Sequence, residues 1–153
     1  MKPYTVTLFG HREIYDYKLI DEKLPQIICK ILHDHEYVDF LIGRQGEFDE
    51  YAASIIKRVL NREVWRNGTL NLVLPYKVAN IEYYAKYYDD IIIPESLQKA
   101  HPKAAARLKN RYMVDASDTV VAYVRKEGGA YQALKYAIEQ GKSVINIVND
   151  ELY

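Results

Sequence analysis

Short runs rich in Val, Ile and Leu alternate along this chain with longer amphipathic segments, and this alternation constrains the fold more than any other feature. Strands are expected at residues 4–9, 38–42, 70–74, 90–93, 119–124 and 144–148, and helices at residues 21–33, 48–61, 81–87, 103–115 and 130–140. Such alternation is typical of a parallel sheet covered by helices on both faces. With right-handed crossovers, it predicts one Rossmann-like, doubly wound α/β domain over residues 1–153, with a mainly parallel sheet.

The composition narrows the classes of function. The chain has 21 basic and 21 acidic residues and a formal net charge of zero, so it gives no strong signal for binding DNA or RNA. A local group of cations could still contact an anion; it comprises Lys103, Arg107, Lys109 and Arg111. The sequence has no secretory signal pattern and no apolar run of the roughly 18 residues that a membrane span needs. We therefore expect a soluble, cytoplasmic protein that does not associate with membranes.

Single residues carry further expectations. The lone cysteine, Cys29, excludes an internal disulfide and a Cys-based zinc site, and its mostly apolar neighbours predict a buried, inert thiol. Pro25 is expected close to the first turn of its helix, where proline is tolerated. The 15 tyrosines are interpreted mostly as half-buried packing residues, and the alternative is a homo-oligomer interface.

Three turns marked by glycine lie where an expected strand passes into a helix, within residues 7–12, 40–46 and 123–129. The carboxyl ends of parallel strands share one edge of the sheet, which is where ligands bind in such folds. Glycine permits close approach of the backbone, and helix N-termini offer N–H groups to anions. Cations occur in the same turns, namely Arg12, Arg44, Arg125 and Lys126. The turns predict a site for a phosphate-bearing small molecule.

In the first turn, Gly10, His11 and Arg12 are candidate ligand-binding residues. Arg12 could bind a phosphate or a carboxylate with two hydrogen bonds. His11 could donate a hydrogen bond or take part in acid–base chemistry, since the ordinary pKa of histidine lies near physiological pH. A solvated His–Arg pair in a surface turn explains the same residues equally well.

In the second turn, Gly43 and Gly46 could surround a phosphate with backbone N–H groups, beside Arg44. Glu47 and Asp49 at the start of the next helix either stabilise the helix dipole or bind ribose hydroxyls. Together with His11, these two acids are weak candidates for catalysis.

The third group of candidates comes from later in the chain. Gly128, Gly129 and Tyr131 open a helix after a strand, and Asn110 and Arg111 could face the same ligand. Arg111 and Asp115 can pair at spacing i,i+4. That pair either lies in solvent or orients its neighbours toward the ligand.

Other site classes find little support in the sequence. There is no G-x-G-x-x-G or Walker A motif, and no Ser-His-Asp, Cys-His or G-x-S-x-G arrangement. No metal site is expected either. His33 and His35 are two apart in a helical segment, so their side chains do not face each other.

In order, four segments resemble the YpsA-like branch of the SLOG superfamily, which also contains DNA-processing protein A and the lysine-decarboxylase-like LOG proteins. They read TLFGHR at 7–12, GRQGEFD at 43–49, NRYMVDASD at 110–118 and GG at 128–129. The resemblance covers nearly the whole chain. It implies a Rossmann-like domain that binds a nucleotide or nucleotide-derived ligand at these loops.

One departure from that superfamily bears on activity. LOG phosphoribohydrolases carry P-G-G-x-G-T-x-x-E, whereas residues 127–135 read EGGAYQALK, without the third glycine, the threonine or the glutamate. We therefore expect a binding or sensing module that requires no cofactor. The first alternative is a hydrolase of a nucleotide N-glycosidic or phosphate bond, in which Arg12 and Arg44 hold phosphate and Glu47 or Asp49 acts as base or ribose ligand. The second is a tyrosine-rich oligomeric scaffold.

Overall fold

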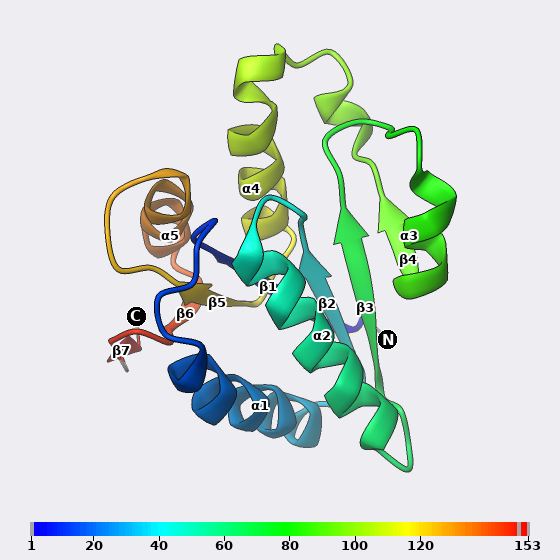
Figure 1. Cartoon of the computed structure of the whole chain (residues 1–153), viewed down its shortest axis with the longest axis vertical. Helices are drawn as coiled ribbons and strands as arrows, with labels where there is room; N and C mark the ends of the chain where they lie inside the picture. Colours follow the sequence, from blue (N-terminus) through cyan, green and yellow to red (C-terminus); the bar gives the residue numbers. More distant parts are fainter. Residues whose placement is uncertain (1, 150, 153) are drawn as a thin grey trace.

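A computed structural model describes residues 2–149 and 151–152. Its centre is a seven-stranded sheet with the order β4-β3-β2-β1-β5-β6-β7 (Figure 1). The strands are β1 (Tyr4–Gly10), β2 (Val38–Ile42), β3 (Gly68–Val73), β4 (Asp90–Ile92), β5 (Thr119–Tyr123), β6 (Ser143–Asn146) and β7 (Glu151–Leu152). The first six are parallel, and β7 pairs with β6 in the antiparallel direction. The predicted Rossmann-like α/β class is confirmed; the short strand β7 was not expected.

Helices cover both faces of the sheet (Figure 1). They are α1 (Tyr17–Asp34), α2 (Glu47–Arg62), α3 (Ile81–Tyr87), α4 (Ala105–Asp115) and α5 (Gly129–Glu139), with short 3₁₀ turns at Glu95–Leu97 and Pro102–Ala104. Alternate residues of β1 point to opposite faces, as the pleat requires. Val6 and Leu8 pack in the core beneath α1 and α2, whereas Phe9 packs in the core beneath α4 and α5.

Helix α1 corrects three expectations. The carboxylate of Asp16 accepts the backbone N–H of Leu19 at 3.1 Å and caps the helix, so α1 begins at Tyr17, ahead of the predicted residue 21. Pro25 therefore lies inside the helix and not in its first turn. Cys29 is exposed, not buried, because the buried stripe of α1 passes through Ile28 and Ile31.

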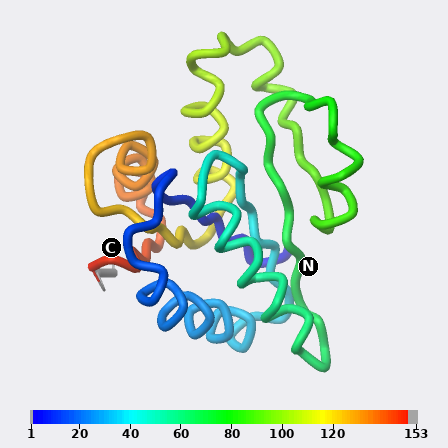
Figure 2. Tube along the Cα trace, viewed as in Figure 1, coloured from blue at the N-terminus to red at the C-terminus, as the bar shows by residue number. Residues whose placement is uncertain are grey.

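The order of the strands positions a site. From β1 the chain moves outward through β2, β3 and β4, and then crosses to the other side of β1 to form β5 (Figure 2). The direction of winding reverses between β1 and β5, and open α/β sheets hold ligands at the carboxyl ends of strands at such a reversal. Within the described residues, no helix combines the length and the apolar character needed to cross a membrane.

Candidate functional site

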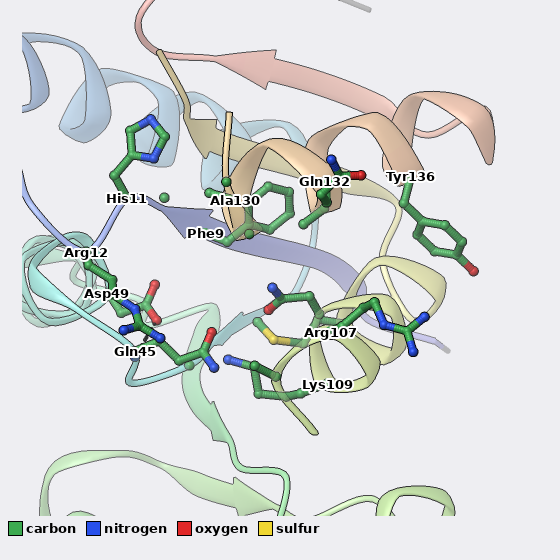
Figure 3. A pocket seen from close by; sticks show the side chains of 18 of the residues that line it. Phe9, His11, Arg12, Gln45, Asp49, Arg107, Lys109, Ala130, Gln132 and Tyr136 are labelled. Atoms are coloured by element: carbon green, nitrogen blue, oxygen red, sulfur yellow. Dashed lines mark hydrogen bonds between the residues drawn. The ribbon is translucent and has the colours of Figure 1, made fainter. Parts of the chain in front are cut away.

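A cavity of about 780 Å³ opens at the carboxyl ends of β1 and β5 (Figure 3). The turn after β1 forms one wall, with residues 10–13 and Tyr15, and Gly43 and Gln45 after β2 form the next. Residues 126–130 after β5 and the inner side of α4 complete the cavity. The three glycine-marked turns therefore meet in one place, as expected for parallel strands.

The cavity contains many of the residues proposed from the sequence, but not all of them. Those that line it are Gly10, His11, Arg12, Gly43, Asp49, Asn110, Arg111, Gly128 and Gly129. Those that do not are Arg44, Gly46, Glu47, Asp115 and Tyr131.

Arg44 and Glu47 are engaged elsewhere. The guanidinium of Arg44 lies 4.2 Å from the centre of the Tyr84 ring and donates to Glu50 at 3.1 Å. Glu47 accepts the hydroxyl of Tyr17 at 2.8 Å and the backbone N–H of Ile14 at 3.3 Å. Glu47 thus connects α2 to the loop before α1 and to the start of α1. Arg44 connects the second turn to α3.

Tyr136 contacts both Arg111 and Asp115, the two residues of α4 whose spacing allows a pair. Its hydroxyl donates to Asp115 at 2.7 Å, and the guanidinium of Arg111 lies 4.7 Å from the centre of its ring. Among the described ion pairs none joins Arg111 to Asp115. Tyr131 packs against the core beneath α4 and α5.

The glycines differ in what a side chain would meet. A Cβ on Gly10 would lie 2.6 Å from the Phe48 ring, and one on Gly46 would lie 2.4 Å from Cα of Arg12. These two glycines are required by close packing. At Gly128 and Gly129 a Cβ would meet nothing within 4 Å, and Gly128 has φ 146°, which favours glycine. The third turn is therefore open to the cavity.

His11 is a buried acceptor and not a free base. Only 8% of the residue is exposed, and its Nε2 accepts the backbone N–H groups of Arg125 at 2.8 Å and Lys126 at 3.4 Å. Burial, reinforced by the charges of Lys126 and Arg125, lowers the pKa of His11. The neutral imidazole therefore joins the first turn to the third.

The charge lining the cavity favours an anion. Six cationic side chains border it against three acidic ones. The cations are Arg12, Lys103, Arg107, Lys109, Arg111 and Lys126, and the acids are Glu13, Asp49 and Glu127. Clefts lined by one sign of charge attract ligands of the other sign. In the part of the chain that the structure describes, no group of three or more His, Cys, Asp or Glu residues could hold a metal ion.

Asp49 and Lys109 are the buried charges of the site. Asp49 is 5% exposed and Lys109 is 2% exposed, and Asp49 accepts the backbone N–H of Gln45 at 2.9 Å. Burial raises the pKa of Asp49 and lowers the pKa of Lys109, while the charge of each opposes the shift of the other.

The polar lining residues that were not singled out from the sequence include Gln45, Gln132 and Tyr136. Two of them belong to α5, where Gly129, Gln132 and Tyr136 follow one another at spacings of three and four. Residues at those spacings share one face of a helix. A helical projection that starts from the third turn would have found them.

No protein-family model matches this chain, and no curated protein matches its sequence. Solved structures do resemble it. DNA processing protein A (DprA) from Streptococcus pneumoniae superposes with a TM-score of 0.67 at 14% identity, over 93% of this chain and 49% of that protein. The chain therefore spans about half the length of DprA.

Two structures of the molybdenum cofactor carrier protein from Chlamydomonas reinhardtii also match. Their TM-scores are 0.55 and 0.54 at 18% and 19% identity, and each match covers 94% of this chain and 75% of the carrier. At such identities the likeness shows the fold alone, a Rossmann-like α/β fold that this chain shares with DprA and the carrier protein.

Proposed function

We propose that this chain is a binding domain for a nucleotide or a nucleotide-derived phosphate compound, and that it belongs to the YpsA-like branch suggested by its motifs. The third glycine turn carries the proposal. Helix α5 begins at Gly129 with no side-chain cap and no acid in its first turn. Within the described part of the chain, no acceptor is found for the backbone N–H groups of Gly129 and Ala130.

The second glycine turn is less suited to phosphate. Two of its N–H groups are already used, because Gln45 donates to Asp49 at 2.9 Å and Glu47 donates to the carbonyl of Arg12 at 2.8 Å. Acids also occupy the first turn of α2, where they take the place that an anion would have. We therefore assign the phosphate to the start of α5.

Other features of the cavity agree with this assignment. Its excess of cationic side chains favours an anion, and its volume of about 780 Å³ lies within the range of ordinary small-molecule sites. The likeness to a protein named as a cofactor carrier is a further reason to expect a bound small molecule.

Calorimetric titration with nucleoside mono- and diphosphates tests the proposal. Gly129→Val should obstruct the N–H groups of α5, and Arg12→Ala should remove a charge from the cavity wall. Loss of one charge-assisted contact should weaken binding about ten- to hundredfold. Arg44→Ala, outside the cavity, is the matched control. The proposal fails if no phosphate compound binds, or if all three variants bind like the wild type.

The hydrolase is kept as a second candidate because of Asp49. This carboxylate borders the cavity, and burial raises its pKa, as is common for groups that transfer protons. Glu47 is a weaker candidate, since it lies outside the cavity. We expect no release of free base when nucleoside monophosphates are incubated with the protein and followed by chromatography. Release that disappears in Asp49→Asn would favour the hydrolase.

A homo-oligomer is a separate candidate, favoured by aromatic side chains that are exposed in the single chain. Trp65 is 85% exposed and Tyr83 is 71% exposed, and such residues are enriched at protein interfaces. Light scattering of the purified protein measures its mass, and a monomer at all concentrations would contradict this candidate.

A further inference from the structure

Lys109 projects a buried ammonium group into the candidate site. The inference drawn from this group rests on the proposed function. Only 2% of Lys109 is exposed. Across the residues that the structure describes, its Nζ has neither a hydrogen bond nor an ion pair within 4.0 Å. In that part of the chain, every side-chain nitrogen or oxygen that is fully shielded from solvent has a hydrogen-bond partner. The ammonium must therefore open onto the cavity that it lines.

The carboxylate of Asp49 faces this ammonium across Gly43. The position that a Cβ on Gly43 would occupy lies 2.2 Å from Nζ of Lys109 and 3.3 Å from Oδ2 of Asp49. The two charged atoms are thus at most about 5.5 Å apart, the sum of those two distances. Since no ion pair forms within 4.0 Å, a gap remains between them.

The gap suits one oxygen atom that both accepts and donates. Hydrogen bonds of roughly 2.7–3.2 Å from nitrogen and 2.5–3.0 Å to oxygen, meeting at an angle, span such a separation. An ammonium can only donate, and an ionised carboxylate can only accept. A hydroxyl group satisfies both partners, whereas the oxygens of a phosphate dianion have no proton to give and would be repelled by Asp49.

We infer that Asp49 and Lys109 form a hydroxyl-binding subsite, which selects ligands that carry a sugar hydroxyl together with their phosphate. Gly43 maintains the gap, because any side chain there would occupy it. Figure 3 shows Asp49 and Lys109 across the cavity from Ala130, in the first turn of α5. The ligand is therefore oriented with its phosphate at α5 and its sugar toward α2 and α4.

Matched ligands test this subsite by calorimetry. The probes are the four common ribonucleoside monophosphates, their 2′,3′-dideoxy counterparts and inorganic phosphate. Removing a hydroxyl that is bonded to two charged groups should weaken binding by about tenfold or more. In Asp49→Asn and Lys109→Met this preference should disappear, while inorganic phosphate still binds.

Gly43→Ala provides a test in which both charges remain. The added Cβ would displace the far end of a flexible side chain, Nζ of Lys109, so the fold should survive while the preference for hydroxyls is lost. Arg44→Ala, next in sequence, should keep the preference. Thermal unfolding of every variant confirms that it is folded.

The possible results separate this inference from the proposed function. Equal binding of ribo- and dideoxyribonucleotides by the wild type overturns the hydroxyl subsite and leaves the phosphate site intact. A preference that survives unchanged in Asp49→Asn, Lys109→Met and Gly43→Ala also overturns it, because the hydroxyl is then recognised elsewhere. If no phosphate compound binds the wild type, both proposals fall.

Discussion

His11 and Arg125 are joined across the carboxyl edge of the sheet, where Nε2 of the His11 imidazole accepts the backbone N–H of Arg125 at 2.8 Å. A ring nitrogen can accept only when it carries no proton, so this bond requires the neutral imidazole. The two turns that it joins form neighbouring walls of the cavity. One contact between these walls thus depends on the protonation state of a single histidine.

We predict that acidification destabilises the protein through His11. Burial and nearby cations lower the pKa of His11 below its ordinary value of 6.5. Between the folded and unfolded pKa values the unfolded chain binds more protons. The contribution of His11 to the free energy of unfolding is therefore complete above the unfolded pKa and declines as the pH falls through the folded pKa. Urea denaturation between about pH 5 and pH 7.5 measures this slope.

His11→Gln is the control for that prediction. Its amide oxygen can accept a backbone N–H but does not titrate in this range. The free energy of unfolding should therefore vary less with pH in the variant than in the wild type. Identical slopes would mean that protonation of His11 does not govern the stability of the two turns.

A second prediction distinguishes two glycines that are alike in the sequence. Gly46→Ala places a Cβ about 2.4 Å from Cα of Arg12, a backbone atom that cannot move aside easily, and overpacking of this kind lowers stability by about 1–3 kcal/mol. Gly129→Ala adds its Cβ to open space at the start of α5, so its stability should be unchanged or slightly raised. Thermal unfolding compares them. Equal melting temperatures would contradict the close approach at Gly46.

The comparison of these glycines shows what could be read from the sequence. That the turns at Gly10, Gly43 and Gly128 meet follows from parallel topology alone. Which glycine serves packing and which faces the cavity depends on contacts between distant residues, such as Gly43 with Lys109 and Gly46 with Arg12. No local pattern contains such contacts, because they arise only when the helices pack on the sheet.

Other differences have equally specific causes. Arg44 lies in a glycine turn as expected, but its guanidinium makes a cation–π contact with Tyr84, forty residues later in the chain. The prediction that Cys29 is buried rests on its apolar neighbours in sequence, whereas burial in a helix depends on the face on which a residue lies. The early start of α1 could have been found, since Asp is a favoured N-cap residue and Asp16 precedes the helix.

A third prediction concerns Arg44. Arg44→Ala removes a cation–π contact with the buried Tyr84 ring, which contributes roughly 0.5–2 kcal/mol to stability. The exposed partner Glu50 adds little. We expect the free energy of unfolding in urea to fall by about 1 kcal/mol, with nucleotide affinity unchanged. Arg12→Ala should instead weaken nucleotide binding and leave the free energy of unfolding nearly unchanged. If Arg44→Ala weakened binding as much as Arg12→Ala, Arg44 would regain its role as a phosphate contact.

The last prediction concerns Pro25, which lies inside α1. A proline within a helix donates no hydrogen bond to the carbonyl four residues earlier, here that of Asp21, and its ring crowds that carbonyl. Alanine would restore the bond and relieve the crowding. Proline restricts the unfolded chain, however, and that restriction offsets part of the gain. We expect Pro25→Ala to raise the free energy of unfolding by about 1–2 kcal/mol.

Urea denaturation of Pro25→Ala measures that gain, and Gln26→Ala, one position along the same helix, is the control for a general effect of alanine. Helix propensity differs little between Gln and Ala, so the control should stay within about 0.5 kcal/mol of the wild type. Since Pro25 is not one of the residues that line the cavity, nucleotide affinity should be the same in both variants. Destabilisation by Pro25→Ala would show that α1 depends on proline at this position in order to pack.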